Sequence, residues 1–463
     1  MEANMKIKNI AELSQRRDRA QKSRNAVKEI VHLCSGAGCI ASGAMDVKEA
    51  LEKEIEKAGL SVQVKETGCL GPCAQGPVIL MKPDETFYEG VKPEDTSRIV
   101  AEHLGQRKVV EELTHRNHSS GLKVETIDKV DFYQGQARIV LRNCGTIDPL
   151  DLDDFIGAGG YAALAKTLEQ YSREQIIEEI QHSGLRGRGG AGFPTYLKWE
   201  FTRRAEGDEK FVLCNADEGD PGAFMDRSVL EGDPHSLIEG MAIAAYAVGA
   251  DRGFVYVRAE YPLAVERFGK AIKQSREAGL LGDHILGTDF SFDLEIRMGS
   301  GAFVCGEETA LIHSIEGKRG EPRPRPPFPA QKGLWDKPSL LNNVETYTNV
   351  AAIIDKGAHW YAEHGSEHSK GTKVFALAGA INVSGLVEVP IGTSLGELIF
   401  DVGGGIPDGK PFKAAQIGGP SGGCIPKEYL NVPLDYHTLS ELGAIMGSGG
   451  LIVMGDDTCM VDV

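Results

Sequence analysis

The sequence lacks several features that would place it in a broad class of protein. No apolar run is long enough to span a bilayer: the longest, near MAIAAYAVGA at 241–250, falls well short of the roughly 20 residues required. The opening segment, MEANMKIKNIAELSQRRDRAQKSR, has no continuous apolar core, so we expect no secretory signal and a cytoplasmic location. Acidic residues outnumber basic ones by 67 to 50, and the net charge of −17 argues against a general affinity for nucleic acid or anionic membranes.

The length and composition are those of a globular protein with several domains. The 463 residues are too many for one ordinary core, and 41% of them are hydrophobic and 25% charged. The nine cysteines stand in a chain that we expect in the cytoplasm, where disulfides are rare. We therefore interpret closely spaced cysteines as candidate metal ligands or reactive thiols.

Four of the cysteines form two close pairs. Cys34 and Cys39 have the spacing C-x4-C, and Cys69 and Cys73 have the spacing C-x3-C. Hydrophobic periodicity predicts a strand, a helix, a strand, a hairpin and a last helix over residues 26–108, with both pairs in loops at strand ends. Four thiolates on glycine-rich loops suit an iron–sulfur cluster. The alternatives are a zinc site, which more often uses C-x2-C pairs, and four unligated buried thiols. The segment resembles the thioredoxin-like 2Fe-2S ferredoxin domain.

A glycine run, GRGGAG at 187–192, matches the G-x-G-x-x-G spacing of a dinucleotide-binding loop. An ordinary Rossmann unit places a strand before the glycines, whereas SREQIIEEIQHSGL predicts a helix there. The loop still has the chemistry of an anion site, because Arg186, Arg188 and Lys198 surround flexible glycines with positive charge. The alternative is a flexible surface loop anchored by neighbouring aromatic side chains.

Two later segments strengthen the signal of a binding site. FVLCNADEGDPGAFMDR at 211–227 predicts a buried strand that ends in an acidic loop, and FSFDLEIRMGSGAFVCGEETALIHSIEGKRGEP at 290–322 predicts a strand, a glycine loop and a helix. Together with RGRGGAGFPTYLKW, EPRPRPPFPA and NNVETYTNV, they resemble the NADH-binding flavoprotein subunit of complex I and the diaphorase subunits of NAD-dependent hydrogenases and formate dehydrogenases. Because the 2Fe-2S segment is fused in front, the closest resemblance is to the beta subunit of multimeric, electron-bifurcating iron hydrogenases.

This resemblance implies FMN and a 2Fe-2S cluster as cofactors and NAD(H) as substrate. The residues in motifs that would contact FMN are Gly187, Arg188, Gly189, Gly190, Lys198, Asn215, Asp217, Glu218, Phe303, Gly306, Glu307, Asn342 and Asn343. Those that would contact NAD(H) are Phe193, Phe201, Glu308, Arg325 and Phe328, and Gly190 would also lie at the dinucleotide pyrophosphate. The cluster ligands would be Cys34, Cys39, Cys69 and Cys73. Hydride transfer between nicotinamide and flavin needs no general base, so we expect no catalytic side chain.

Two residues depart from the pattern of the resembled family. Phe303 stands where complex I members have tyrosine, so a hydrogen bond is lost there and the flavin potential would differ. Arg325 stands where lysine is expected, and its planar fork could hold a 2′-phosphate. Glu308 would repel that phosphate, so we favour NAD over NADP.

The sequence therefore predicts an α/β protein of several domains. The expected order is an N-terminal helical tail (1–25), the thioredoxin-like 2Fe-2S domain (26–108), a linker (109–150), a non-standard Rossmann-like FMN- and NAD(H)-binding domain (151–370), a soluble-ligand-binding β-grasp domain (371–430) and the start of a helical domain (431–463). We favour a spacer without a ligand as the interpretation of the β-grasp segment. Family members hold a 4Fe-4S cluster in the helical domain, but after residue 430 this sequence contains only Cys459, so those ligands are absent from it.

These observations favour an NAD(H)-linked flavoprotein subunit of a multimeric oxidoreductase, in which FMN exchanges hydride with NAD and single electrons with iron–sulfur clusters. The expected partners are an iron–sulfur hydrogenase subunit and a small 2Fe-2S subunit, with ferredoxin as a further candidate. A complex I flavoprotein subunit and a formate dehydrogenase diaphorase are alternatives with the same chemistry. A non-catalytic adaptor is the alternative from a different class.

Overall fold

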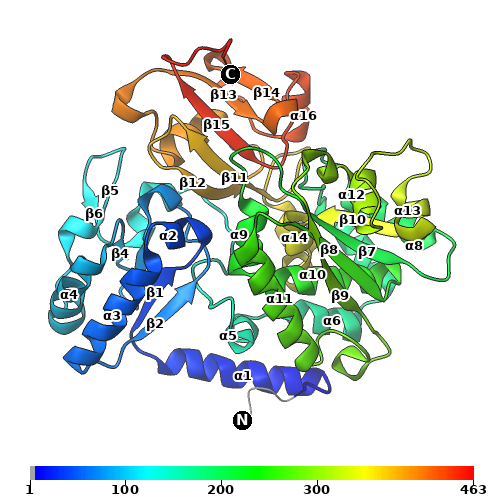
Figure 1. The fold of residues 1–463 in the computed structure, drawn as a ribbon, viewed down its shortest axis with the longest axis horizontal. Coiled ribbons are helices and arrows are strands. Elements are labelled where there is room, and N and C mark those ends of the chain that lie inside the picture. The colour runs from blue at the N-terminus through cyan, green and yellow to red at the C-terminus, as the bar shows by residue number, and fades with distance from the viewer. Residues whose placement is uncertain (1–5, 463) are drawn as a thin grey trace.

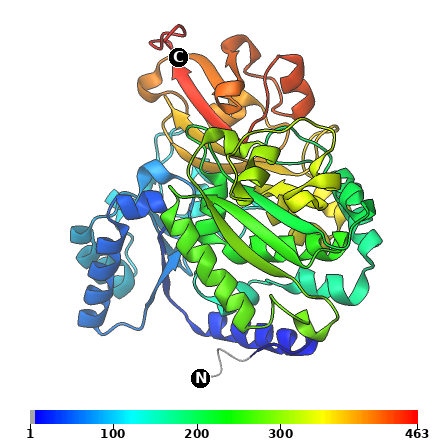
Figure 2. The ribbon, with the colours of Figure 1, turned by 45° about the vertical axis from the view of Figure 1, so that its right-hand side comes forward.

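Three sheets of four or five strands, each with its own helices, organise the chain (Figure 1). A computed structural model describes residues 6–462, so residues 1–5 of the expected N-terminal tail lie outside the described residues. An N-terminal domain, a central domain and a β-grasp domain follow one another in sequence, and Figure 2 shows the β-grasp domain above the other two. Within residues 6–462, no helix is both long and apolar enough to cross a bilayer.

The elements are numbered along the chain. The helices are α1 (Ile10–Ala26), α2 (Ala37–Ala41), α3 (Ala44–Ala58), α4 (Thr96–Arg98), α5 (Leu152–Gly157), α6 (Ala162–Gln170), α7 (Arg173–Ser183), α8 (Thr195–Arg204), α9 (Met225–Gly232), α10 (Pro234–Val248), α11 (Pro262–Glu277), α12 (Glu308–Ile315), α13 (Pro329–Lys332), α14 (Val344–Lys356), α15 (Ala358–Ala362) and α16 (Tyr436–Glu441). The strands are β1 (Ile30–Cys34), β2 (Gln63–Thr67), β3 (Ile79–Lys82), β4 (Phe87–Tyr88), β5 (His115–Arg116), β6 (Lys123–Val124), β7 (Phe211–Ala216), β8 (Arg252–Arg258), β9 (Asp293–Gly299), β10 (Ser339–Asn343), β11 (Thr372–Gly379), β12 (Gly385–Pro390), β13 (Phe412–Ile417), β14 (Gly423–Pro426) and β15 (Gly450–Gly455).

The N-terminal domain is built on a mixed sheet of order β2-β1-β3-β4. β1 pairs in parallel with β2 and antiparallel with β3. α3 belongs to the core of this domain, because Val47, Leu51 and Ile55 recur at helical spacing and are buried. α1 packs along α5 of the central domain instead, where Arg24 pairs with Asp154 at 2.8 Å (Figure 1). The described part of the expected tail is therefore a packed helix that joins two domains.

Residues 109–150, expected as a linker, are packed rather than free. The segment forms the short hairpin β5–β6, and Val110, Phe132, Val140 and Cys144 are buried. Its apolar residues are scattered among charges, so no local period marks them for burial. Removing them from water is favourable and fixes the segment against its neighbours. The segment expected as a linker therefore packs against the domains that it connects.

The central domain contains a parallel sheet of order β10-β7-β8-β9. Alternate residues of β7 face opposite cores. Val212 and Cys214 join the large core that includes α10 and α14, whereas Phe211 and Leu213 pack with α12. Burial of both faces is the rule for parallel sheets and explains the nearly continuous apolar run of β7. The chain leads from β7 to β8 and β9 on one side, then returns to place β10 on the other side of β7, so the strand order reverses between β7 and β10.

The β-grasp domain has a five-stranded sheet of order β12-β11-β15-β13-β14. Its middle strand, β15, pairs in parallel with β11 and antiparallel with β13. This strand lies where the start of a helical domain was expected, so the boundary at 430 is wrong and the domain extends to residue 455. The run LIVM at 451–454 gives the reason, because a strand at the centre of a sheet buries both of its faces.

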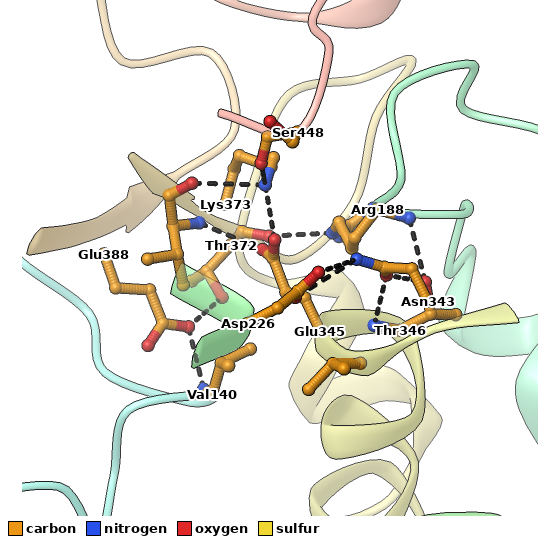
Figure 3. Close-up of polar contacts among 12 residues, drawn as sticks. Val140, Arg188, Asp226, Asn343, Glu345, Thr346, Thr372, Lys373, Glu388 and Ser448 are labelled. Atoms are coloured by element: carbon orange, nitrogen blue, oxygen red, sulfur yellow. Dashed lines mark hydrogen bonds and ion pairs between the residues drawn. The ribbon is translucent and has the colours of Figure 1, made fainter. Parts of the chain in front are cut away.

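One buried ion pair joins the central domain to the β-grasp domain (Figure 3). Lys373 on β11 donates to Glu345 in the first turn of α14, and their side chains are 0% and 1% exposed. Lys373 also donates to the carbonyl oxygen of Ser448, and Glu345 accepts from the backbone N–H of Val374 at 3.0 Å. Both charges are therefore compensated where water does not reach.

We predict that Lys373→Met lowers the free energy of unfolding by about 3 kcal/mol, because it leaves the Glu345 carboxylate buried without its cation. Urea unfolding followed by circular dichroism measures the change. Lys410→Met is the matched control, since Lys410 pairs with Asp457 at 2.9 Å in the same domain but is 47% exposed, and we expect little change from it. Equal effects of the two variants would contradict the prediction, whereas Lys373→Met combined with Glu345→Leu should recover part of the loss.

Candidate functional site

The carboxyl ends of β7 and β10 bring polar residues together where the strand order reverses. Asn215 and Asn343 are register partners at these ends, so their backbones lie side by side. In open parallel sheets, ligands bind outside the carboxyl ends of the strands at such a reversal. Both asparagines belong to the predicted FMN contacts, and Asn342 precedes Asn343 on β10 as a buried residue. We refer to this region as the crevice.

The glycine loop, residues 187–192, lies over the crevice. α7 ends before it and α8 begins after it, so a helix does lead into the glycines. The backbone N–H of Arg188 donates to Oγ1 of Thr346 at 2.9 Å, in the first turn of α14. A Cβ atom on Gly189 would lie 3.4 Å from that of Asn343. Glycine therefore lets this loop approach the edge of the sheet closely.

The side chain of Arg188 turns away from the crevice. Its buried guanidinium donates to the carbonyl oxygens of Arg186, Lys370 and Thr372 and to the hydroxyl of Tyr361. We expected this residue among the FMN contacts partly because of its charge. The charge instead ties the glycine loop to the segment that leads into the β-grasp domain, and the backbone N–H is what contacts the crevice.

The acidic loop after β7 contributes carboxylates to the same crevice. Asn215 accepts from the N–H of Asp217 at 3.0 Å and donates to the carbonyl oxygen of Gly306 at 2.8 Å. The second of these contacts joins the acidic loop to the glycine segment between β9 and α12. Glu218 accepts from two backbone N–H groups at the start of α9. Burial raises the pKa of Asp217 to about 6 and the pKa of Glu218 to about 7.

One oxygen of the acidic loop lacks a partner. Oδ2 of Asp217 is buried and accepts no hydrogen bond from any residue between 6 and 462. A Cβ atom on Gly306 would lie 3.8 Å from this oxygen, so glycine keeps the space beside it open. FMN carries ribityl hydroxyls that donate to such an oxygen and a phosphate that needs amide and cationic donors. Lys198 on α8 reaches the carbonyl oxygen of Leu341 on β10 at 3.4 Å and brings a cation to this edge. The residues present therefore fit FMN.

Two glutamates at the start of α12 both lie within ion-pair distance of Arg325 but differ in their other partners. Glu307 is the N-cap and accepts from two backbone N–H groups of α12 at 2.9 and 3.0 Å, so its predicted place in the flavin pocket is combined with a capping role. Glu308 lies between Arg325, at 2.6 Å, and Lys198, at 3.4 Å. The fork of Arg325 is therefore already engaged by a carboxylate of the same chain.

The phenylalanines of the predicted site are unusually exposed. Phe193, Phe201 and Phe328 have 43%, 49% and 51% of their surface in contact with solvent. Phe201 lies on α8, which packs against α13, and Phe328 directly precedes α13. Phe303 covers the acidic loop, because a Cβ atom on Gly219 would lie 2.7 Å from its ring. Exposed flat rings of this kind are available to stack on a nucleotide base.

The four paired cysteines converge beside the sheet of the N-terminal domain. Cys34 ends β1, Cys39 lies in α2, and the sulfur atoms of Cys69 and Cys73 are 3.4 Å apart. Hydrogen bonds from the thiols of Cys39 and Cys69 lower the pKa of Cys34. A Cβ atom on Gly76 would lie 2.8 Å from the sulfur of Cys39, so glycine is required next to the thiols. This donor set fits a 2Fe-2S cluster, which takes four thiolates.

A buried arginine of the central domain contacts the cysteine loop. Arg267 on α11 donates to Oγ of Ser35, the neighbour of Cys34, and to the carbonyl oxygen of Glu231, each at 2.9 Å. The carboxylate of Glu231 accepts from the N–H of Ala37 at 2.9 Å. The central domain thus places a positive and a negative group next to the thiols.

Three residues that contact the predicted site were missing from the predicted set. Thr346 accepts from the glycine loop, Asp226 accepts from the side chain of Asn343 at 3.1 Å, and Tyr436 donates to the carbonyl oxygen of Gly187 at 2.9 Å. The N-cap spacing of Asn343 and Thr346 in NNVET was a usable signal for the first. No local pattern marks Tyr436, because it lies 249 residues from its partner.

Two family models match the chain. The model of the Nuo51 FMN-binding domain matches residues 180–352, and the model of the thioredoxin-like [2Fe-2S] ferredoxin matches residues 20–104. These matches confirm the predicted cofactors and decide between the cluster and the zinc alternative for the cysteine pairs.

Relatives of known name cover most of the chain. The NADP-reducing hydrogenase subunit HndC of Solidesulfovibrio fructosivorans is 60% identical over 328 residues, which are 71% of this chain and 66% of that protein, just under two thirds of its length. A subunit of an NADH-quinone oxidoreductase of Rhizobium meliloti is 46% identical over 323 residues, which are 70% of this chain and 77% of that protein. The crystal structure of an NAD+-reducing [NiFe]-hydrogenase in the H2-reduced state matches with a TM-score of 0.60 and 27% identity, and covers 98% of this chain and 77% of that chain.

We predict that Arg267→Met makes the midpoint potential of the 2Fe-2S cluster more negative, because it removes a positive charge and a hydrogen bond beside Cys34 while Glu231 remains. A redox titration followed by electron paramagnetic resonance measures the potential. Lys270→Met, on the same helix but half exposed, is the control and should leave the potential unchanged. An unchanged or more positive potential in Arg267→Met would show that the arginine serves only to dock the two domains.

Proposed function

The chain belongs to the family of FMN-dependent, NADH-oxidising flavoprotein subunits, and we propose that it is the NAD(H)-reactive subunit of a multisubunit hydrogenase. It carries the FMN-binding and thioredoxin-like 2Fe-2S domains that the sequence predicted. Bound FMN supplies two-electron exchange with a nicotinamide and one-electron exchange with iron–sulfur clusters.

The convergence of three segments on the crevice carries the proposal. The glycine loop, the acidic loop and the first turn of α14 meet at the carboxyl ends of β7 and β10. These segments present backbone amides and Oδ2 of Asp217, which accepts no hydrogen bond from the described residues, and Lys198 of the neighbouring α8 adds a cation. These are the groups that a flavin phosphate and ribityl chain require.

The side chains act by positioning rather than by proton transfer. Hydride transfer requires the nicotinamide to lie flat against the flavin ring, with the two reacting carbons nearly in contact. We assign the exposed rings of Phe193, Phe201 and Phe328 to holding the dinucleotide from its adenine end. No general base takes part in this step, so we assign none.

The choice of dinucleotide rests on Glu308. Its ion pair with Arg325 occupies the guanidinium that could otherwise hold a 2′-phosphate. Its own charge repels that phosphate. These contacts support NAD. Of two hydrogenase relatives, one is named as NADP-reducing and the other as NAD-reducing.

We predict that Glu308→Gln raises the ratio of NADPH to NADH oxidation about tenfold, since it removes the repulsion and leaves Arg325 with only its longer, 3.9 Å ion pair to Glu307. Steady-state rates with each dinucleotide, using an artificial electron acceptor, measure this ratio. Glu321→Gln, an exposed change in the same region, is the control. A ratio that stays constant in Glu308→Gln, or faster oxidation of NADPH than of NADH by the unaltered chain, would contradict the assignment to NAD.

The partners we propose are an iron–sulfur hydrogenase subunit and a small 2Fe-2S subunit, with ferredoxin as a further electron partner. The hydrogenase relatives support this assignment. The second candidate function is that of a flavoprotein subunit of complex I, which the relatives named as subunits of NADH-quinone oxidoreductase support. Electron bifurcation stays a prediction.

The visible spectrum of the full chain, expressed with FMN and iron available, tests the proposal. We expect flavin and iron–sulfur absorption, and we expect both to bleach when NADH is added without oxygen. The non-catalytic adaptor predicts a chain that takes up no FMN, or that holds FMN which NADH does not reduce. Either result would overturn the proposed function.

A further inference from the structure

The β-grasp domain touches the glycine loop directly. The hydroxyl of Tyr436, the first residue of α16, donates to the carbonyl oxygen of Gly187 at 2.9 Å. The ring of Tyr436 fills the space beside Gly192, where a Cβ atom would lie 2.5 Å from it. The guanidinium of Arg186 lies over the same ring at 5.2 Å and donates to the carbonyl oxygen of Gly192 at 2.6 Å. One tyrosine therefore contacts the loop at both of its ends.

The β-grasp domain also touches the middle of the glycine loop and the acidic loop. A Cβ atom on Gly190 would lie 3.0 Å from the Cα of Gly447, so the two backbones are in close contact. Ser448 donates to the carboxylate of Asp220 at 2.6 Å, and a Cβ atom on Gly419 would collide with that carboxylate at 2.3 Å. The two loops, which bear six of the thirteen predicted FMN contacts, thus both rest on this domain.

Buried polar groups form the interface between the central domain and the β-grasp domain (Figure 3). Figure 3 shows Arg188 from the glycine loop, Glu345 from α14 and Lys373 from β11 in one network. Glu388 on β12 accepts from the hydroxyl of Thr372 and from the backbone N–H of Val140. Buried charges and hydrogen bonds of this kind are costly to break. The β-grasp domain is therefore a fixed neighbour of the crevice rather than a spacer.

A glycine loop needs such a neighbour. Gly190 and Gly192 have φ values of 126° and 63°, and glycine loses more conformational freedom on ordering than any other residue. A cofactor that binds a loose loop must supply that ordering itself, which weakens its apparent affinity. Contacts that order the loop beforehand remove this cost.

We propose that Tyr436 of the β-grasp domain is a positioning residue for the flavin, which latches the glycine loop in the conformation that receives the cofactor. This inference rests on the proposed function for the identity of the ligand. It gives the β-grasp domain a role in cofactor binding in place of the spacer that the sequence favoured.

Tyr436→Phe tests the latch, because it removes the hydroxyl and keeps the ring. We expect the amide hydrogens of residues 187–193 to exchange faster in the flavin-free chain, and the dissociation constant for FMN to rise about fivefold, the effect of one neutral hydrogen bond. Tyr436→Ala, which also exposes Gly192 and Arg186, should weaken FMN binding further. Flavin fluorescence titration measures the dissociation constant.

Tyr429→Phe is the matched control, since Tyr429 lies in the same domain and is 43% exposed. It should change neither quantity, and a thermal melt should show that every variant is folded at the temperature of the assays. Faster exchange without weaker FMN binding would overturn the proposal, and so would equal exchange in Tyr436→Phe and the unaltered chain. If the unaltered chain bound no FMN, the proposed function would fail, whereas the exchange rates would still decide whether Tyr436 holds the loop.

Discussion

The parallel pairing of β7 with β10 is the constraint on which the site depends. Both strands are buried on two faces, so their register is fixed by the packing of alternate residues into separate cores. That register places Asn215 beside Asn343, and each asparagine organises a different loop. Asn215 donates to Gly306, in the glycine segment between β9 and α12. Asn343 caps α14 and thereby presents Thr346 to the glycine loop. A shift of one residue between these strands would separate Asn215 and the acidic loop from Asn343 and the helix that it caps.

The crevice is also a place where like charges gather, and the fold has to compensate them. Burial raises the pKa of Glu218 and of Asp226, and the neighbouring carboxylates raise that of Asp226 further. The folded chain therefore binds protons there that the unfolded chain would release, so this cluster favours folding at low pH and loses that contribution as pH rises through the raised values. Lys373 offsets part of the remaining negative charge, which explains why a lysine with no exposed surface is tolerated on β11.

The sequence revealed the parts of the site that local spacing encodes. The cysteine pairs, the helix that leads into the glycine loop and the acidic strand end each lie within about a dozen residues, where periodicity and motif are informative. It could not reveal contacts made across the chain. Arg188 was interpreted from its charge, whereas its direction is set by acceptors more than 170 residues away. Strand β15 was missed for the same reason, because LIVM alone does not say which sheet completes it.

A single short helix connects the two cofactor regions. The start of α9 is held by Glu218 of the acidic loop. At its other end, Gly232 lies against Gly68, because a Cβ atom on Gly68 would fall 2.4 Å from the Cα of Gly232. Gly68 directly precedes Cys69 in the sequence. Eight helical residues span about 12 Å, so the separation of the flavin crevice and the cysteine quartet is set by one rigid element rather than by a flexible linker. The buried contacts of Arg267 and Glu231 hold the same junction from the side. The relative position of the two regions therefore depends on packing within this chain, and not on a flexible connection between two domains.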